Sequence, residues 1–218
     1  MNPQPPRLAS QHLLVALSRL ARLQGQSLDP VELDGLKAMA GDQIVLSCNG
    51  PTTPAVLTLA VVEGAAMGGG CGLAAACDLV LAADSAQLAM PEVTLGLPPA
   101  QIAPFVAERI GERAALRLMA TGQRIGAVEA ARIGLVDEVV PVAELDAALK
   151  RWAEQLQRAE PQALRATRSI LRHSATESLG DKLDFAAQCF ARSLRSGTAS
   201  EGLAALAAKR PPGWATPT

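Results

Sequence analysis

The sequence has few of the residues that build metal sites and disulfide frameworks. Its 218 residues include two histidines and four cysteines, and no two cysteines form a CxxC pair. Zinc sites and disulfide frameworks need such side chains in clusters at short spacings, so neither is indicated. We expect a protein that requires neither a metal ion nor a redox cofactor.

Three motifs of large enzyme classes are also missing. The chain contains no GxGxxG, no GxxxxGK[ST] and no GxSxG. Their absence argues against a dinucleotide site, a phosphate-binding P-loop and the nucleophile elbow of serine hydrolases.

The charges are balanced, with 20 Lys and Arg against 21 Asp and Glu, and no basic stripe stands out. A nucleic-acid partner is therefore not expected. The uncharged run over residues 64–77 is glycine-rich and too short to span a bilayer, and no basic segment followed by an apolar core opens the chain. We expect a soluble, cytoplasmic protein without a membrane partner, and 49% apolar residues are ample for its core.

What the sequence does contain is a strand pattern that leads into three consecutive glycines. Residues 55–62 (AVLTLAVV) suit a strand covered on both faces, and residues 73–77 favour a helix. Glycines allow a ligand to approach the main chain, and a helix N-terminus adds partial positive charge. The junction at residues 68–70 therefore predicts a site that stabilises an oxyanion. A tight turn that binds no ligand is the alternative.

Elsewhere, strand and helix patterns alternate before the chain becomes almost all helical. Residues 11–24 and 30–39 have helical spacing, whereas residues 43–47 and 79–84 are typical of strands. Strands separated by helices predict parallel crossovers. From Phe105 onward we expect helices over about 104–110, 112–121, 127–133, 143–158, 161–173, 178–196 and 199–209.

A second informative segment is AMPEVTLGLPP at residues 89–99. With the glycine junction, Cys77-Asp78 and the strand that follows, it resembles the crotonase family of enoyl-CoA hydratases and isomerases. The resemblance continues in order through residues 116–122, 127–141, 161–166 and 201–210. It implies an α/β fold with a crotonase-like ββα spiral core over residues 1–141, its N-terminal part short or divergent. It also implies a C-terminal helical trimerisation region over residues 142–218.

The resemblance also implies a chemistry. Family members hold the carbonyl oxygen of an acyl-CoA thioester between two backbone N–H donors and thereby stabilise an enolate. Gly69 matches one donor and Glu92 matches a proton-transfer glutamate, whereas Gly72 stands where hydratases typically carry a second glutamate. Coenzyme A would enter as part of the substrate, with no further cofactor. The residues expected to bind the substrate are Met67, Gly68, Gly69, Gly72, Leu97 and Lys209.

Alternatives remain for two of these residues. Glu92 is a surface-loop carboxylate if the match is only to the fold. Lys209 resembles a terminal lysine that reaches the phosphates of coenzyme A, and a solvated helix end is equally compatible with its position.

Two departures from the family pattern leave the reaction open. After the strand expected near residues 44–50, the chain has PTTP where the family presents Ala-Gly-Ala-Asp with the other oxyanion donor. Either this segment is deleted, or the N-terminal part is too divergent to align. The segment from Pro99 to Pro104 replaces a glycine-rich loop of many hydratases. Together with Gly72 it resembles the branch that acts on branched glutaconyl-type CoA thioesters.

Glu92 alone can still move a proton between two carbon atoms of a substrate, which is isomerase chemistry. The expected function is therefore of the enoyl-CoA hydratase/isomerase type. The alternative is a degenerate crotonase-fold protein that binds acyl-CoA weakly or serves as an assembly partner.

The last two predicted helices carry apolar stripes, formed by Leu179, Leu183, Ala186, Phe190 and Leu194, and by Leu203, Leu206 and Ala207. Such faces need a partner surface. In the crotonase family the terminal helices pack across a trimer interface, so the resemblance implies a homotrimer or a hexamer. A compact monomer with a helical cap is the alternative.

Overall fold

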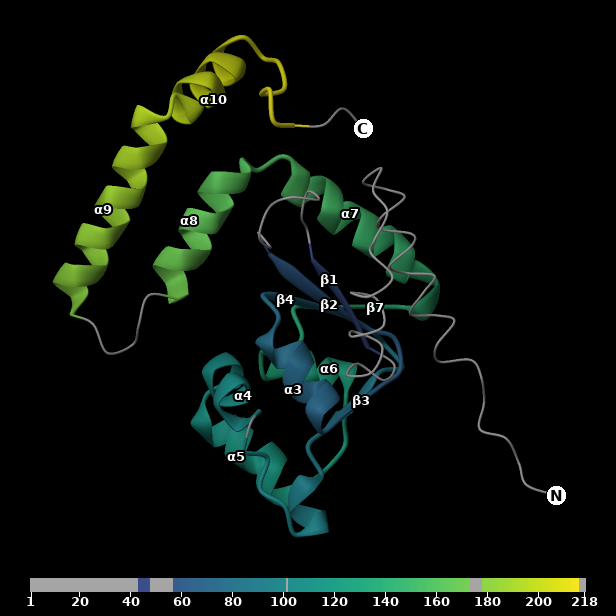
Figure 1. Cartoon of the computed structure of the whole chain (residues 1–218). Coiled ribbons are helices and arrows are strands. Elements are labelled where there is room, and N and C mark those ends of the chain that lie inside the picture. The colour runs from purple at the N-terminus through teal and green to yellow at the C-terminus, as the bar shows by residue number, and fades with distance from the viewer. Residues whose placement is uncertain (1–42, 48–56, 101, 173–177, 216–218) are drawn as a thin grey trace, which may run out of the picture. The chain divides into compact units, whose positions relative to one another are not determined.

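The computed structural model describes residues 57–100, 102–172 and 178–215, together with the backbone of residues 43–47 (Figure 1). These residues belong to two compact units, divided between Leu149 and Lys150. The division falls inside helix α7 (Leu145–Gln157), C-terminal to the boundary expected after residue 141. The helices predicted over 11–24 and 30–39 lie outside the described residues.

The first unit contains a four-stranded sheet with the strand order β1-β2-β4-β7. Its strands are β1 (Gln43–Ser47), β2 (Thr58–Val62), β4 (Leu79–Ala83) and β7 (Glu138–Val140). Strand β2 pairs with β4 in parallel, and β4 with β7, as the alternation of strand and helix patterns predicts. Strands β1 and β2 are antiparallel, because the chain between them is too short for the crossover of a parallel pair.

Strands β2 and β4 form the centre of the core. Residues 59–62 and 80–83 are all buried, which explains why these segments read as continuous apolar runs. Asp78 ties the starts of the two strands together. The N–H and Oγ1–H of Thr58 both donate to Asp78 Oδ2 at 2.8 Å, and the N–H of Asp78 donates back to Thr58 Oγ1 at 3.0 Å.

A second sheet has the strand order β3-β5-β6. Strand β3 (Ala65–Met67) pairs in parallel with β5 (Gln87–Ala89), and β5 pairs antiparallel with β6 (Ile125–Gly126). These strands are too short for an alternating pattern to be recognised in sequence, and none of them was expected. This small sheet nevertheless sets the geometry of the candidate site.

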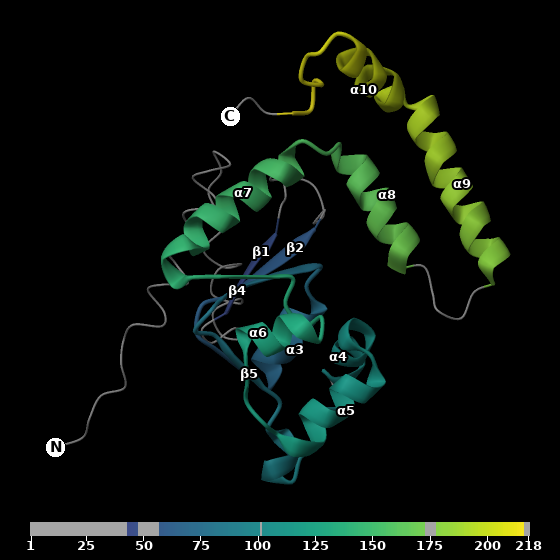
Figure 2. The same ribbon diagram turned by 180° about the vertical axis from the view of Figure 1, so that it is seen from behind.

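The helices of the first unit begin and end close to the predicted positions. They are α3 (Gly69–Ala76), α4 (Ala103–Ile110), α5 (Glu112–Thr121) and α6 (Ala127–Arg132), with short 3-10 helices η1 (Glu92–Leu95) and η2 (Val142–Glu144). Helices α4 and α5 lie side by side (Figure 2). Strands β6 and β7 interrupt the region beyond Phe105 that the sequence suggested to be almost all helical.

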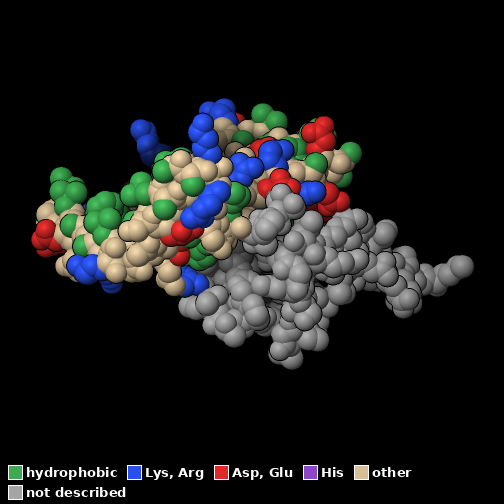
Figure 3. Space-filling view, turned by 90° about the horizontal axis from the view of Figure 1, so that it is seen from above, with side chains coloured by type: hydrophobic (Ala, Val, Ile, Leu, Met, Phe, Trp, Pro, Cys, Tyr) green, Lys and Arg blue, Asp and Glu red, His purple; other side chains and the backbone are tan. Residues whose placement is uncertain are grey.

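The second unit is helical and has little core of its own. It contains the end of α7, then α8 (Pro161–Arg172), α9 (Leu179–Arg195) and α10 (Thr198–Ala207). Helices α8 and α9 lie side by side (Figure 1). None of the helices in the described ranges is long and apolar enough to cross a membrane. The large apolar side chains exposed here are Leu171, Leu179, Leu183, Phe190, Leu194, Leu203 and Leu206, and Figure 3 shows hydrophobic side chains over this unit.

The C-terminal tail folds back onto α10. Arg210 donates to both carboxylate oxygens of Glu201, at 2.8 and 3.0 Å, and the N–H of Gly213 donates to Glu201 Oε1 at 3.0 Å. These hydrogen bonds lower the pKa of Glu201 to about 2, and the bonds from Arg210 have the larger effect. Trp214 donates from Nε1 to the carbonyl of Arg158 at 3.2 Å. The tail is thus held by the bidentate ion pair between Arg210 and Glu201 and by the hydrogen bond of Trp214.

Candidate active site

The small sheet brings together the glycine junction and the segment that carries Glu92. Strands β3 and β5 are parallel, with Met67 opposite Ala89 at their ends. Helix α3 follows β3, and Glu92 follows β5 within three residues. The N–H of Gly68 donates to the carbonyl of Ala89 at 2.8 Å and fastens the two segments together. The carboxyl ends of parallel strands are the usual location of binding sites in α/β folds.

Helix α3 begins inside the glycine run, four residues before the start predicted from the sequence. Gly68 is its N-cap, with φ 55° and ψ −120°, a conformation that glycine adopts far more easily than other residues. The intrahelical hydrogen bonds begin with the N–H of Gly72, which donates to the carbonyl of Gly68 at 3.1 Å. Gly69 is the first helical residue, where the helix offers its N–H no acceptor.

The main chain at Gly69 is open to a ligand. Gly69 is exposed, and a Cβ added there would meet no atom within 4 Å. The N-terminus of α3 adds partial positive charge at this point. An accessible N–H at a helix N-terminus can stabilise negative charge on an oxygen atom, which is the role expected of Gly69.

The carboxylate of Glu92 lies beside this helix start. Its Oε1 is 3.0 Å from the position that a Cβ on Gly68 would take. Its Oε2 is buried and has no hydrogen-bond partner among the described residues. A buried polar atom without a partner is rare in folded proteins and often marks a functional group. Glu92 is therefore placed to accept a proton or a hydrogen bond from a bound ligand.

The buried thiol of Cys71 is the nearest other ionisable group on α3. Burial, followed by the negative charge of Glu92, raises the pKa of Cys71 to about 12. Cys71 is therefore a neutral thiol at physiological pH and a poor nucleophile. Glu92 is therefore the better candidate for proton transfer at this end of α3.

The turn that carries Glu92 is fixed from two sides. The N–H and the Oγ1–H of Thr94 donate to the carbonyl of Pro91 at 2.9 and 2.7 Å. Gly122, the C-cap of α5, has φ 58°, and a Cβ added to it would lie 2.9 Å from Thr94 Cγ2. The end of α5 thus supports the turn, and this close approach requires glycine.

Gly72 lies one helical turn beyond Gly68 and faces a side chain that the sequence did not single out. A Cβ on Gly72 would overlap the Cβ of Ile102 and lie 2.5 Å from its Cγ2. Ile102 is the N-cap of α4 and is half-buried. Ile102 lies in the segment from Pro99 to Pro104, but its contact with Gly72 was not predicted, because that contact depends on how α4 packs against α3.

The other residues expected to bind substrate lie in different places. Met67 ends β3 next to Gly68. Leu97 follows η1, where its N–H donates to the carbonyl of Glu92 at 3.1 Å and its side chain is exposed. The structure thus brings Met67, Gly68, Gly69 and Glu92 together. Lys209 belongs to the second unit.

The backbone of Lys209 is unusual. Lys209 ends α10 in the left-handed conformation, with φ 52°, and no other described non-glycine residue has a positive φ. The N–H of Arg210 donates to the carbonyl of Ala205, and that of Lys209 to the carbonyl of Leu206. This pair of bonds is the Schellman helix ending, which usually places glycine at this position.

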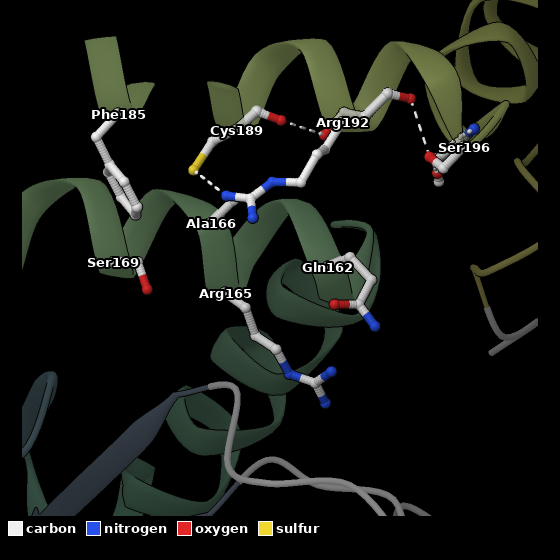
Figure 4. Close-up of a pocket in the computed structure, with 10 residues that line it drawn as sticks. Gln162, Arg165, Ala166, Ser169, Phe185, Cys189, Arg192 and Ser196 are labelled. Atoms are coloured by element: carbon white, nitrogen blue, oxygen red, sulfur yellow. Dashed lines mark hydrogen bonds between the residues drawn. The ribbon is translucent and has the colours of Figure 1, made fainter. Parts of the chain in front are cut away.

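A pocket of about 370 Å³ lies between α8 and α9 (Figure 4). The guanidinium of Arg192 turns back along α9 and donates to the Sγ of Cys189 at 3.0 Å. The residues around this pocket include arginines, serines and Phe185, without a carboxylate or a histidine. The described residues also contain no group of three His, Cys, Asp or Glu side chains placed to hold a metal ion. The start of α3 is therefore the better candidate for acid–base chemistry.

Comparison with known proteins identifies relatives of this arrangement. The family model for enoyl-CoA hydratase/isomerase matches residues 51–217. The chain is 35% identical over 156 residues to the 2,3-dehydroadipyl-CoA hydratase of Escherichia coli K12, an alignment that covers 71% of this chain and 61% of that protein. The chain thus spans about three fifths of the length of such curated relatives.

Solved structures agree with this assignment. The AtuE protein of Pseudomonas aeruginosa is 45% identical with a TM-score of 0.70, and the match covers 72% of this chain and 62% of that one. An enoyl-CoA hydratase/isomerase from Marinobacter aquaeolei is 43% identical, also with a TM-score of 0.70, over 72% of this chain and 60% of that one. The fold is therefore the crotonase-like α/β fold that the motifs indicated, with a helical C-terminal region.

Proposed function

We propose that this chain, which belongs to the enoyl-CoA hydratase/isomerase family, acts on an acyl-CoA thioester through an enolate and moves the proton with Glu92. The observation that carries the proposal is the buried, unpartnered Oε2 of Glu92 beside the accessible N–H of Gly69. A thioester oxygen at Gly69 and a reacting carbon at Glu92 would use both groups.

The proposed step starts with the carboxylate of Glu92 as the base. Glu92 takes a proton from a carbon that is acidified by the thioester, and the C–H electron pair moves into the enolate, whose charge rests on the thioester oxygen. The N–H of Gly69 donates to that oxygen. Return of the proton to a different carbon gives the isomer. One oxyanion donor of this kind contributes about 3–4 kcal/mol to transition-state stabilisation.

Hydration would require Glu92 both to take a proton from water and to give a proton to the α-carbon, because Gly72 offers no second carboxylate. We therefore place isomerisation, or another reaction with a single proton carrier, ahead of hydration. The branch acting on glutaconyl-type thioesters remains a candidate for the substrate class because of Gly72 and the segment from Pro99 to Pro104. Coenzyme A is then the carrier of the substrate, and the proposed mechanism uses no other cofactor.

A second candidate is a protein of the same fold that binds acyl-CoA weakly or assembles with a partner without catalysis. Gly72 supports it, because that position has lost the side chain that a second acid–base group would need. The segment where the family's other oxyanion donor is expected lies outside the described residues. An activity test therefore has to separate the two candidates.

Replacement of Glu92 by Gln is that test. Glu92→Gln should lower kcat for isomerisation of a 3-enoyl-CoA by at least about a hundredfold, because the amide keeps the size of the side chain but cannot carry the proton. Calorimetric affinity for the same thioester should stay within a few-fold. Glu112→Gln, at the exposed start of α5, is the matched control and should retain wild-type turnover.

Two results would redirect the proposal. Unchanged turnover in Glu92→Gln would move the proton-transfer role to another carboxylate, and Glu63 and Glu108 would be the next to replace. Wild-type protein that binds the thioester without converting it would favour the non-catalytic candidate.

A further inference from the structure

Two residues one turn apart on α3 face two different kinds of side chain. Gly68 is the N-cap, and its carbonyl accepts the first intrahelical hydrogen bond, from the N–H of Gly72 at 3.1 Å. The carboxylate of Glu92 lies over Gly68, and the side chain of Ile102 lies over Gly72. A carboxylate and an alkyl side chain therefore cover successive positions at the start of α3.

Ile102 cannot simply move aside. The atoms nearest to Gly72 are its Cβ and Cγ2, which are fixed close to the backbone, so any side chain on residue 72 would require α4 itself to shift. Arg109 holds α4 in place. It donates to the carbonyls of Cys77 and Leu135, at 2.8 and 3.0 Å, and to Asp137 Oδ2 at 2.5 Å.

The surface over Gly72 is therefore apolar, because the side chain of Ile102 forms it. Ile102 is half-buried, so part of its side chain remains accessible. An ordered water needs two or more polar partners, and an isoleucine side chain provides none. A substrate atom in this position gains most if it is apolar, because it exchanges water for hydrocarbon contact.

We infer that Ile102 is a specificity-determining residue that selects acyl groups with an apolar branch next to the carbon at which Glu92 acts. This inference rests on the proposed function, since it needs an acyl group at the start of α3. It adds that one residue of the segment from Pro99 to Pro104, the N-cap of α4, selects the shape of the acyl group.

The test compares two thioesters that differ by one methyl group, pent-3-enoyl-CoA and 4-methylpent-3-enoyl-CoA. Formation of the conjugated product is followed for the wild type, Ile102→Ala and Ile102→Val. The wild type should prefer the branched 4-methylpent-3-enoyl-CoA, and Ile102→Ala should lower the ratio of the two kcat/KM values in its favour by about tenfold or more, the usual effect of a methylene-sized change in an apolar pocket. A wild-type preference for the unbranched thioester would contradict the inference. Ile102→Val should change it less, in the same direction.

The outcomes separate the inference from the proposed function. An unchanged ratio in Ile102→Ala, with turnover retained, would overturn the role of Ile102 and leave the role of Glu92 intact. If Ile102→Ala fails to fold, Ile102→Val supplies the same comparison, and an unchanged ratio there would overturn the inference. A wild type that converts neither thioester would overturn the proposed function itself.

Discussion

The two units of this chain bury their apolar residues to very different extents. In the first unit, strands β2 and β4 and the helices around them enclose a core that runs from Leu59 to Leu149. In the second unit, the fully buried apolar residues among those described are Ala153, Cys189 and Ala205. Leu179, Leu183, Phe190, Leu194, Leu203 and Leu206 are all at least half exposed there. The first unit therefore encloses a buried core, whereas the described part of the second unit exposes most of its large apolar side chains.

We propose that the first unit carries the chemistry and the second unit the assembly. The candidate site uses a helix start, a short sheet and one carboxylate, all within the first unit. The apolar faces of α9 and α10 take no part in it and need a covering surface. We propose a homotrimer or a hexamer as the assembly that covers them, so that substitutions in the two units should have separable effects.

The largest expected effect is on association. The double substitution Leu183→Asp and Phe190→Asp places two charges on the exposed face of α9 and should convert a trimer or hexamer into smaller species. Val128→Asp is the control, since Val128 is 73% exposed on α6 of the first unit. Sedimentation at micromolar concentration distinguishes these states. A wild-type monomer that is soluble at that concentration would contradict the proposed assembly.

The next effect concerns two glycines of α3 that differ in their surroundings. Gly72→Ala should lower the free energy of unfolding by about 2 kcal/mol, because the added methyl overlaps Ile102. Gly69→Ala adds the same methyl in open space and should leave stability near the wild-type value while it lowers turnover. Urea denaturation and kinetics of both variants provide the comparison.

A double substitution checks the cause of the first effect. Ile102→Gly removes the overlapping Cβ, and glycine is tolerated at an N-cap. The loss caused by Gly72→Ala should therefore be much smaller in the Ile102→Gly background. An equal loss in both backgrounds would show that the contact with Ile102 does not set the requirement for glycine at residue 72.

Sequence patterns predicted the long elements well, because burial and helical spacing leave repeated signals in them. The helices from α4 to α10 and strands β1, β2 and β4 lie within a few residues of their expected bounds. The strands that build the site, β3 and β5, are three residues long and left no such signal. Glu92 and Gly69 were identified because they occur in motifs of the crotonase family.

Ile102 and Gly122 were not identified, for a different reason. Their roles depend on distances between elements that are far apart in the chain, and a single sequence does not report such distances. The start of α3 was placed too late because three glycines in a row usually disfavour a helix. Here Gly68 supplies the positive φ of the helix entrance, and Gly69 and Gly70 are already helical.

A smaller effect is expected at Lys209. Lys209→Gly should raise the free energy of unfolding by about 1 kcal/mol, because glycine adopts the left-handed conformation without steric cost. Lys209→Ala removes the same amine but keeps a Cβ at this position. If Lys209 contacts coenzyme A phosphates, both variants should bind coenzyme A more weakly, and only Lys209→Gly should be stabilised. Equal stability of the two variants would contradict the strain argument.

The smallest effect is the acid sensitivity of the tail. The folded pKa of Glu201, about 2, lies below its ordinary value of 4.5 because Arg210 and the N–H of Gly213 donate to it. The stabilisation is therefore present above pH 4.5 and is lost as the pH falls from 4.5 towards 2. The difference in Tm between the wild type and Glu201→Gln should shrink over this range. A constant difference would show that the ion pair does not stabilise the fold.

The most direct test of the account is a crystal structure of the protein with a non-reactive acyl-CoA analogue. We predict a thioester oxygen within 2.7–3.1 Å of the Gly69 nitrogen, which is the range for an oxyanion donor. The acyl group should have one carbon facing the carboxylate of Glu92. An analogue bound between α8 and α9, or bound with its thioester away from α3, would contradict the claim that the chemistry belongs to the first unit.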